Sequence, residues 1–292
     1  MAQPASGADL PLFRFVQLEF PWELGPPDGR YVVRGHAGEV DQVVVTQTLG
    51  AAERRGIVRN RKPRGVAPEP EPTPVTVSRV TIVAPEPFAE RDEGAPWLRS
   101  VDTEDETTAA VAVLNRLLHL YRTATADPYA REVAREQAIC VRVGIGEGEQ
   151  VAHGRWTDAV QLPPVARKRD TRNAALRPQE RLAALLGGRD AALACEELIL
   201  RARIDLDAGR SREAALQLRV ALEAAIAELA PWAGQQAVAD RLDGLRAERR
   251  AVGAAANRAL EGGLDEEAIA DLTRIVGLVE SVLRARTAAG FS

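Results

Sequence analysis

The stretch "FRFVQLEF", residues 13–20, decides the fold of the N-terminal half. Its apolar residues Val16, Leu18 and Phe20 alternate with the polar residues Gln17 and Glu19, which is the two-residue period of a strand that buries one face. Further runs rich in β-branched residues are bounded by turn residues and predict four more strands, at 31–34, 41–49, 75–83 and 138–145. The first half is therefore expected to be dominated by a sheet.

One long helix is expected among these strands. Thr103 and Glu106 fit a capping box, and an apolar stripe at helical spacing follows from Ala110 to Tyr121. A short second helix is predicted to begin at Asp127-Pro128, and "QVAHGRW" (150–156) is expected to pair back on the preceding strand as a hairpin. Strands with interposed helices, but without a regular strand-helix alternation, predict an α+β domain.

The second half has helical periodicity throughout. Gly and Pro residues divide it into predicted helices, at 178–186, 189–208, 212–229, 235–260 and 266–287, with Asp265 as the N-cap of the last. The prediction is an α+β chain. A mostly antiparallel sheet domain with one or two helices covers residues 1–163, a linker covers 164–175, and an all-α bundle of four or five helices covers 176–292.

Two of these helices are apolar on more than one side. Helix 212–229 is apolar almost all round, which is typical of a buried helix. Helix 189–208 has a larger apolar face and a second one, formed by Leu193, Leu200 and Ile204. A second apolar face predicts an interface, so we expect self-association as a dimer, or a complex with a protein partner, through the bundle.

The stretch "AGRSREAALQLRVALEAA" (208–225) resembles the turn and second helix of a tetratricopeptide repeat, with Gly209, Ala214, Leu218 and Ala221 at matching spacing. The whole 176–287 region resembles a HEPN-type bundle, through its Ala-rich second helix, "RLDGLRAERRAV" (241–252) and a final amphipathic helix. Nuclease members of that group carry an Arg-x4–6-His motif. All three histidines of this chain precede the bundle, so the resemblance implies a helical fold and no catalytic residue.

Composition excludes several classes of protein. The 292 residues carry a net charge of −4 with a pI of about 5.6, which argues against a dedicated nucleic-acid binder. No apolar run approaches the roughly 18 residues of a membrane span, and the N-terminus lacks the pattern of a signal peptide. The sequence predicts a cytoplasmic protein with no membrane association.

Metal and cofactor chemistry also lack a sequence signal. His36, His119 and His153 have no ligand spacing, and Cys140 and Cys195 are expected to be buried structural thiols. The glycine-rich "GIGEGEQ" (144–150) lacks the lysine and the following helix of a phosphate loop, and its glutamates would repel a phosphate. We therefore predict no metal site and no cofactor.

Arg249 interrupts the apolar stripe of the predicted helix 235–260. An arginine facing a core needs a carboxylate partner or must reach the surface, since an unpaired buried charge is costly. Glu196, Glu197 and Glu228 are its candidate partners. The group is interpreted as a buried ion pair, with a ligand-binding arginine as the alternative.

The segment 53–74 combines a basic run with "APEPEPTP" (67–74), a composition typical of an extended, solvated loop. Its six basic residues could instead hold a polyanion or nucleic acid weakly, through phosphate charge alone. Those residues are Arg54, Arg55, Arg59, Arg61, Lys62 and Arg64.

Three functions remain open on the sequence alone. The leading one is a non-enzymatic interaction or assembly protein that acts through its bundle, because no catalytic constellation is recognisable. The first alternative is a small-molecule enzyme with its site between the two domains. The second is a weak polyanion binder through the basic loop.

Overall fold

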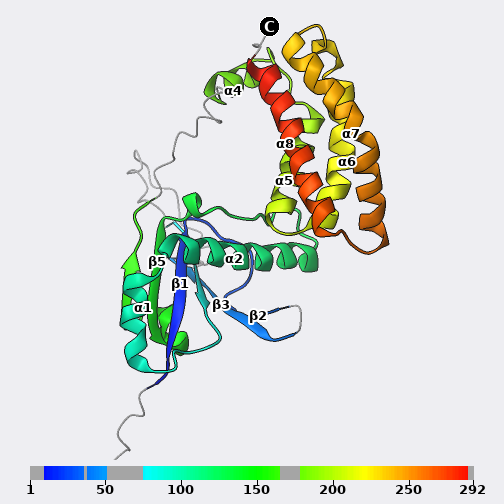
Figure 1. Ribbon diagram of the computed structural model, residues 1–292. Helices are drawn as coiled ribbons and strands as arrows, with labels where there is room; N and C mark the ends of the chain where they lie inside the picture. Colours follow the sequence, from blue (N-terminus) through cyan, green and yellow to red (C-terminus); the bar gives the residue numbers. More distant parts are fainter. Residues whose placement is uncertain (1–9, 36–37, 51–74, 165–177, 289–292) are drawn as a thin grey trace, which may run out of the picture. The chain divides into compact units, whose positions relative to one another are not determined.

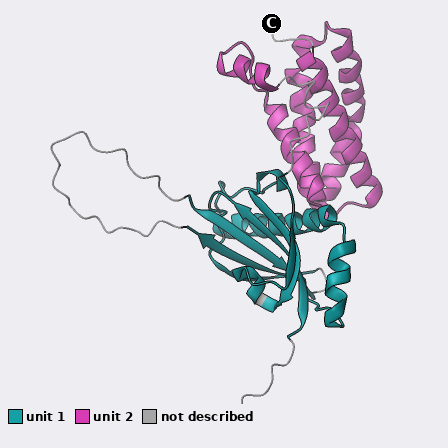
Figure 2. Cartoon of the chain, turned by 90° about the vertical axis from the view of Figure 1, so that its left-hand side faces the viewer, with its two compact units in different colours: residues 1–167 teal, residues 168–292 magenta. Residues whose placement is uncertain are grey.

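The computed structural model describes residues 10–35, 38–50, 75–164 and 178–288 (Figure 1). The chain divides into two compact units, residues 1–167 and 168–292 (Figure 2). The division falls inside the segment 164–175 that the sequence marks as a linker. Unit 1 carries the sheet and unit 2 carries the helical bundle, so the chain is an α+β protein.

Unit 1 is built on a six-stranded sheet whose neighbouring strands are all antiparallel. Along the sheet the order of the strands is β2-β3-β4-β1-β5-β6. Their bounds are β1 Leu12–Phe20, β2 Gly29–Arg34, β3 Val40–Leu49, β4 Val77–Val83, β5 Cys140–Glu147 and β6 Asp158–Gln161. The strand containing "FRFVQLEF" pairs on both sides, with β4 and β5, and therefore lies inside the sheet.

Helix α2 (Thr103–Thr125) covers one face of this sheet, and the shorter α1 (Gly94–Ser100) packs beside it (Figure 1). Leu114, Leu117 and Leu118 of α2 pack into one core cluster with Val16 and Leu18 of β1. The inward phase of β1 is the one that the periodicity predicts. The predicted stripe of α2 is buried at Ala110, Leu114 and Leu117, but Leu120 within it is exposed.

The opposite face of the sheet carries a buried polar network. Gln17 is fully buried and donates to Thr81 Oγ1 at 3.0 Å. Glu19 accepts hydrogen bonds from Arg79 and Arg142, both at 3.0 Å. The polar side chains of "FRFVQLEF" thus find hydrogen-bond partners on the neighbouring strands β4 and β5.

Unit 2 contains five described α-helices, which confirms the expected all-α bundle. Their bounds are α4 Pro178–Leu186, α5 Ala194–Asp207, α6 Ser211–Glu228, α7 Gln236–Glu261 and α8 Glu266–Ala288. Helices α5 to α8 share one core cluster, in which α6 is lined with alanines that let its neighbours approach closely. Helix α6 is less buried than its composition predicts, because Leu216 and Val220 are exposed on its outer side.

Several local predictions are wrong, for identifiable reasons. No α-helix begins at Asp127-Pro128, where Asp127 closes a turn by accepting from the Tyr129 N–H. The N-cap of α2 is Asp102 rather than Thr103, since the Asp102 carboxylate accepts from two first-turn N–H groups. Helix α5 starts at Ala194 and not at 189.

Two further local features concern loops. The predicted hairpin at 150–156 is replaced by a 3₁₀-helix (Gly148–His153), and β6, a few residues later, pairs with β5. The predicted cap of the last helix is confirmed, because Asp265 accepts from the Ala268 N–H at 2.8 Å.

Among the described residues, no helix has the length and apolarity needed to cross a membrane.

Candidate functional site

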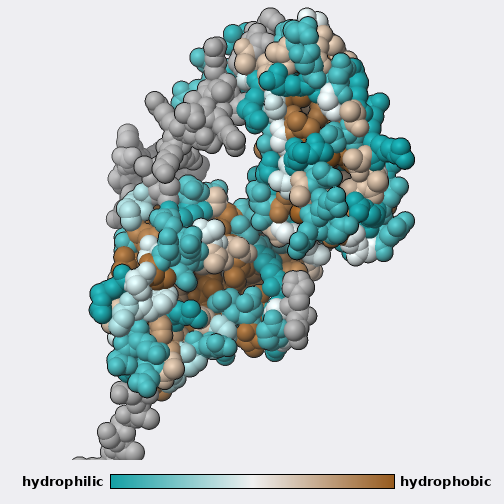
Figure 3. Space-filling model, viewed as in Figure 1, coloured by the Kyte–Doolittle hydropathy of each residue, from teal (hydrophilic) through white to brown (hydrophobic). Residues whose placement is uncertain are grey.

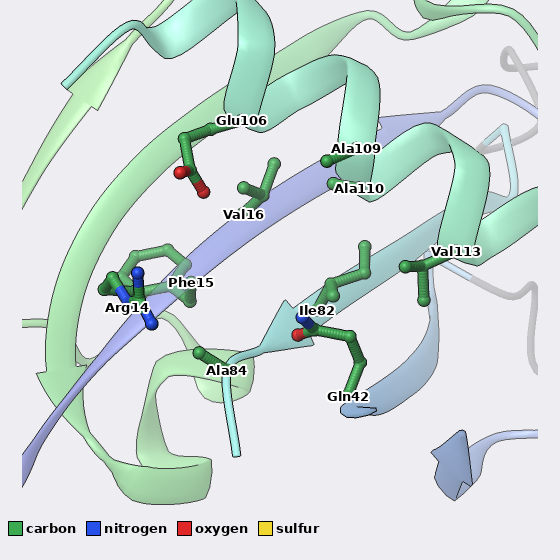
Figure 4. A pocket seen from close by; sticks show the side chains of 10 residues that line it. All are labelled: Arg14, Phe15, Val16, Gln42, Ile82, Ala84, Glu106, Ala109, Ala110 and Val113. Carbon is green, nitrogen blue, oxygen red and sulfur yellow. The ribbon is translucent and has the colours of Figure 1, made fainter. Parts of the chain in front are cut away.

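A cleft of about 230 Å³ lies between α2 and the sheet of unit 1 (Figure 4). Strands β1, β3 and β4 and the segment after β4 form its floor, and the N-terminal half of α2 forms its wall. Three of its polar lining residues come from three different elements: Arg14 from β1, Gln42 from β3 and Glu106 from α2. On the face seen in Figure 3, apolar side chains gather on the surface of unit 1 beside α2.

The cleft forms where the strand register brings a small residue between two long ones. Val44, Ile82 and Val16 are paired across three strands and form a row buried under α2. The next row lies toward the start of β1 and just past the end of β4. It contains Ala84, whose N–H donates to the Arg14 carbonyl at 3.0 Å. The same register places Gln42 on the other side of Ala84, since Val43 and Val83 are paired. A methyl group between an arginine and a glutamine leaves the floor of the cleft hollow.

The helix leaves the same space open from above. Glu106, Ala109, Ala110 and Val113 lie at helical spacing on the side of α2 that faces the cleft. The two alanines in the middle lie beside Val16 in Figure 4 and leave room above the sheet. Small side chains on the floor and on the helix wall therefore create the cavity, rather than an irregular backbone.

Three polar side chains line the cleft. Arg14, Gln42 and Glu106 are all half-buried. Within the described parts of the chain, their side chains make no hydrogen bond or ion pair, either with one another or with a neighbour. In Figure 4 the Glu106 carboxylate, the Arg14 guanidinium and the Gln42 amide border one space. An arginine and a carboxylate that share a small cleft and remain unpaired are available to a ligand.

The sequence contains a signal for these three residues. Arg14 has the same strand phase as Val16, Gln42 has that of Val44, and Glu106 lies on the stripe of Ala110 and Val113. Each is thus a polar residue at a position where the pattern expects an apolar, inward-facing one. The sequence pattern does not specify the pairing register of the strands, which brings these three side chains together.

Searches against family models, curated proteins and solved structures gave no match. The resemblance of unit 2 to a HEPN-type bundle therefore stays an expectation. The candidate site is therefore defined by the geometry of the chain itself.

Arg249 does not lie where the sequence predicts. Its side chain is about half exposed, on the outer side of α7, and donates to Glu223 Oε2 of α6 at 2.7 Å. The interpretation as a buried ion pair with Glu196, Glu197 or Glu228 is wrong. The stripe of α7 winds around the helix, so that Leu245 and Val252 face the core while Arg249 between them does not.

Within the described part of unit 2, the buried cation is Arg286, near the end of α8. Its side chain is 5 % exposed, hydrogen-bonds Asp190, and has its guanidinium carbon 4.6 Å from the centre of the Trp232 ring. Glu196 lies 3.5 Å from it and also pairs with Arg181 of α4. Burial acts to raise the pKa of Asp190, but the Ala191 N–H and the Arg286 guanidinium outweigh it and hold that pKa below its usual value. This Arg286 cluster is charge-balanced and anchors α4 to the bundle.

The two other predicted carboxylates have separate roles. Glu228 accepts from the N–H groups of Ala194 and Cys195 and so satisfies the start of α5. Glu197 is exposed and pairs with Arg201 one turn away. Burial, together with Glu228, raises the pKa of the Cys195 thiol to about 12, which makes it unreactive at neutral pH.

The predicted interface residues divide into two kinds. Leu200 and Ile204 are exposed, by 59 % and 49 %, whereas Leu193 is half-buried against the core of the bundle and is not part of an open face. The six basic residues of segment 53–74 and His36 lie outside the described residues. Among the residues that are described, no group of His, Cys, Asp and Glu could hold a metal ion.

Proposed function

We propose that the chain is a binding protein whose unit 1 takes up a small organic molecule in the cleft between α2 and the sheet. The observation that carries this proposal is a set of three polar side chains that have no partner among the described residues and share the cleft with apolar side chains of the sheet and of α2. Ligand sites in proteins combine these two features, a mostly apolar surface and a few converging polar groups. The volume of about 230 Å³ is below the roughly 300–1,000 Å³ of pockets for drug-sized ligands, so the molecule is small.

Filling the cleft should abolish binding without unfolding the protein. Ala109 is exposed at the rim of the cleft, so phenylalanine at this position occupies the cavity with no core to disturb. A thermal-shift screen of small amphipathic metabolites is expected to yield compounds that raise the melting temperature of the wild type and leave Ala109→Phe unchanged.

Ala112→Phe is the matched control. Ala112 is exposed on the same helix and does not line the cleft, so this variant has the same change in helix propensity and should respond to ligands as the wild type does. A screen in which no compound distinguishes Ala109→Phe from Ala112→Phe would refute the proposed function.

A second candidate function concerns unit 2, which we propose to self-associate through α5. The observation that favours it is the pair Leu200 and Ile204, two large apolar side chains one turn apart on an exposed side of the helix. A second copy of the chain, docking by the same face, would bury both.

Light scattering after size exclusion tests this candidate directly. The wild type is expected to be a dimer at tens of micromolar, and the double variant Leu200→Glu with Ile204→Glu a monomer. Because both residues are exposed, the variant should keep its helical circular dichroism. The control is Leu216→Glu with Val220→Glu on α6, which should leave the dimer intact. A monomeric wild type would exclude this function.

A further inference from the structure

The charges in the cleft specify the chemistry of its ligand. Arg14 offers a cation, Glu106 an anion, and Gln42 an amide that can both donate and accept hydrogen bonds. From this combination we infer that the ligand is a small apolar α-amino acid in its zwitterionic form, with its carboxylate on Arg14 and its ammonium group on Glu106. The inference rests on the proposed function of the cleft.

The two opposite charges of the cleft are separated from one another. Arg14 and Glu106 line one cleft and yet form no ion pair, so their charged atoms are more than 4 Å apart. A molecule that carries both signs can meet each of them with the opposite charge. A carboxylate can accept two parallel hydrogen bonds from a guanidinium, and an ammonium group donates to a carboxylate, which are the strong, charge-assisted kinds of hydrogen bond.

The rest of the cleft is small and mostly apolar. Val16, Ile82 and Val113 present branched apolar side chains to the cavity, and Ala84 and Ala110 present methyl groups. An aliphatic side chain of a ligand would bury its surface against them and gain about 25 cal/mol for each Å² removed from water. An aliphatic amino acid has this apolar part and both charges on one small molecule.

The same residues disfavour other ligands. A phosphate or a dicarboxylate would meet the Glu106 carboxylate as well as Arg14, and like charges at short range repel. An amine without a carboxylate would leave Arg14 half-buried and unpaired. Among the residues that line the cleft, Phe15 is the sole aromatic side chain, which gives no pair of rings to hold a nucleobase.

A matched set of four ligands separates the contributions of the two charges. The set comprises L-leucine, 4-methylpentanoate (no ammonium group), 3-methylbutan-1-amine (no carboxylate) and 3-methylbutan-1-ol (neither charge). Isothermal titration calorimetry with the full chain should give the lowest Kd for L-leucine. Loss of either charge should weaken binding by about tenfold to a hundredfold, as expected for a hydrogen bond to a charged group.

Two variants assign each charge to its residue. Arg14→Gln should weaken L-leucine and 4-methylpentanoate alike and leave the amine unaffected. Glu106→Gln should weaken L-leucine and the amine but not 4-methylpentanoate, since that ligand loses an unfavourable carboxylate neighbour. A merely structural role of either residue would shift all four ligands equally.

The possible failures are distinguishable. If the alcohol or the single-charge ligands bind wild type as tightly as L-leucine, and Ala109→Phe abolishes that binding, the amino-acid inference is wrong and the cleft remains a ligand site. The same holds if none of the four binds while another compound of the screen binds wild type and not Ala109→Phe. If no compound at all depends on the cleft, both proposals fail.

Discussion

Replacement of Arg286 by alanine should lower the free energy of unfolding of unit 2 by about 3–5 kcal/mol. The Arg286 side chain is 5 % exposed and the Asp190 side chain is 6 % exposed. The variant therefore leaves the buried Asp190 carboxylate without one of the two cations that balance its charge. Arg181 remains as a partner, at 3.3 Å from Asp190, but it cannot balance both Asp190 and Glu196. The change also removes the contact between the guanidinium and the Trp232 ring.

The measurement is urea denaturation followed by ¹⁹F NMR of protein labelled with 5-fluorotryptophan. Trp232 reports on unit 2, and the other three tryptophans, Trp22, Trp97 and Trp156, report on unit 1. The control is Arg249→Ala, which breaks an exposed ion pair and should lower the free energy of unfolding by less than about 1 kcal/mol. Equal effects of the two variants would show that the Arg286 cluster does not stabilise the bundle.

Replacement of Gly144 by alanine should destabilise unit 1 by about 1–3 kcal/mol, by overpacking. Gly144 lies in β5, paired with Phe15 of β1 and Ala159 of β6. An added Cβ would lie 2.5 Å from the Asp158 carbonyl oxygen and 2.8 Å from the Phe15 ring. A backbone oxygen cannot move away without loosening the pairing of β6, so the strain falls on the edge of the sheet.

The resonance of Trp156, which lies between β5 and β6 in sequence and packs near Phe15, should report this loss first. The matched control is Gly244→Ala in α7, where an added Cβ meets nothing within 4 Å. Alanine is a better helix former than glycine, so this variant should raise the free energy of unfolding of unit 2 by about 0.5–1 kcal/mol. A Gly144→Ala protein as stable as the wild type would mean that the register of β5 and β6 is wrong.

Periodicity alone predicts most of the fold. The alternation in "FRFVQLEF" identifies both faces of the central strand, and the stripes of α2 and α8 identify their buried sides. These patterns are local, because burial of one face fixes the spacing of apolar residues within each element. They predict most of the elements and the fold class, but they add a helix at Asp127 that does not form and miss the short elements α1 and β6.

The residues of the candidate site depend on long-range geometry instead. Arg14, Gln42 and Glu106 come together because β3, β4 and β1 are neighbours in one register, and no local pattern specifies which strands pair. The wrong assignment of Arg249 has a different cause, the winding of the apolar stripe around α7. Arg286 continues the stripe of Val279, Val282 and Leu283 by one turn, yet its position in the last turn of α8 resembles that of an ordinary basic residue at the C-terminal end of a helix.

We expect the cleft beneath α2 to bind an aliphatic amino acid, and methyl NMR during a titration with L-leucine tests this binding most directly. Ile82 on the floor and Val113 on α2 both line the cleft and carry the labelled methyl groups. The expected result is nuclear Overhauser contacts from the leucine methyl groups to both of these residues, lost in Ala109→Phe and retained in Ala112→Phe. Contacts that survive in Ala109→Phe, or that fall only on methyl groups of unit 2 while the Ile82 and Val113 signals stay unshifted at millimolar ligand, would contradict it.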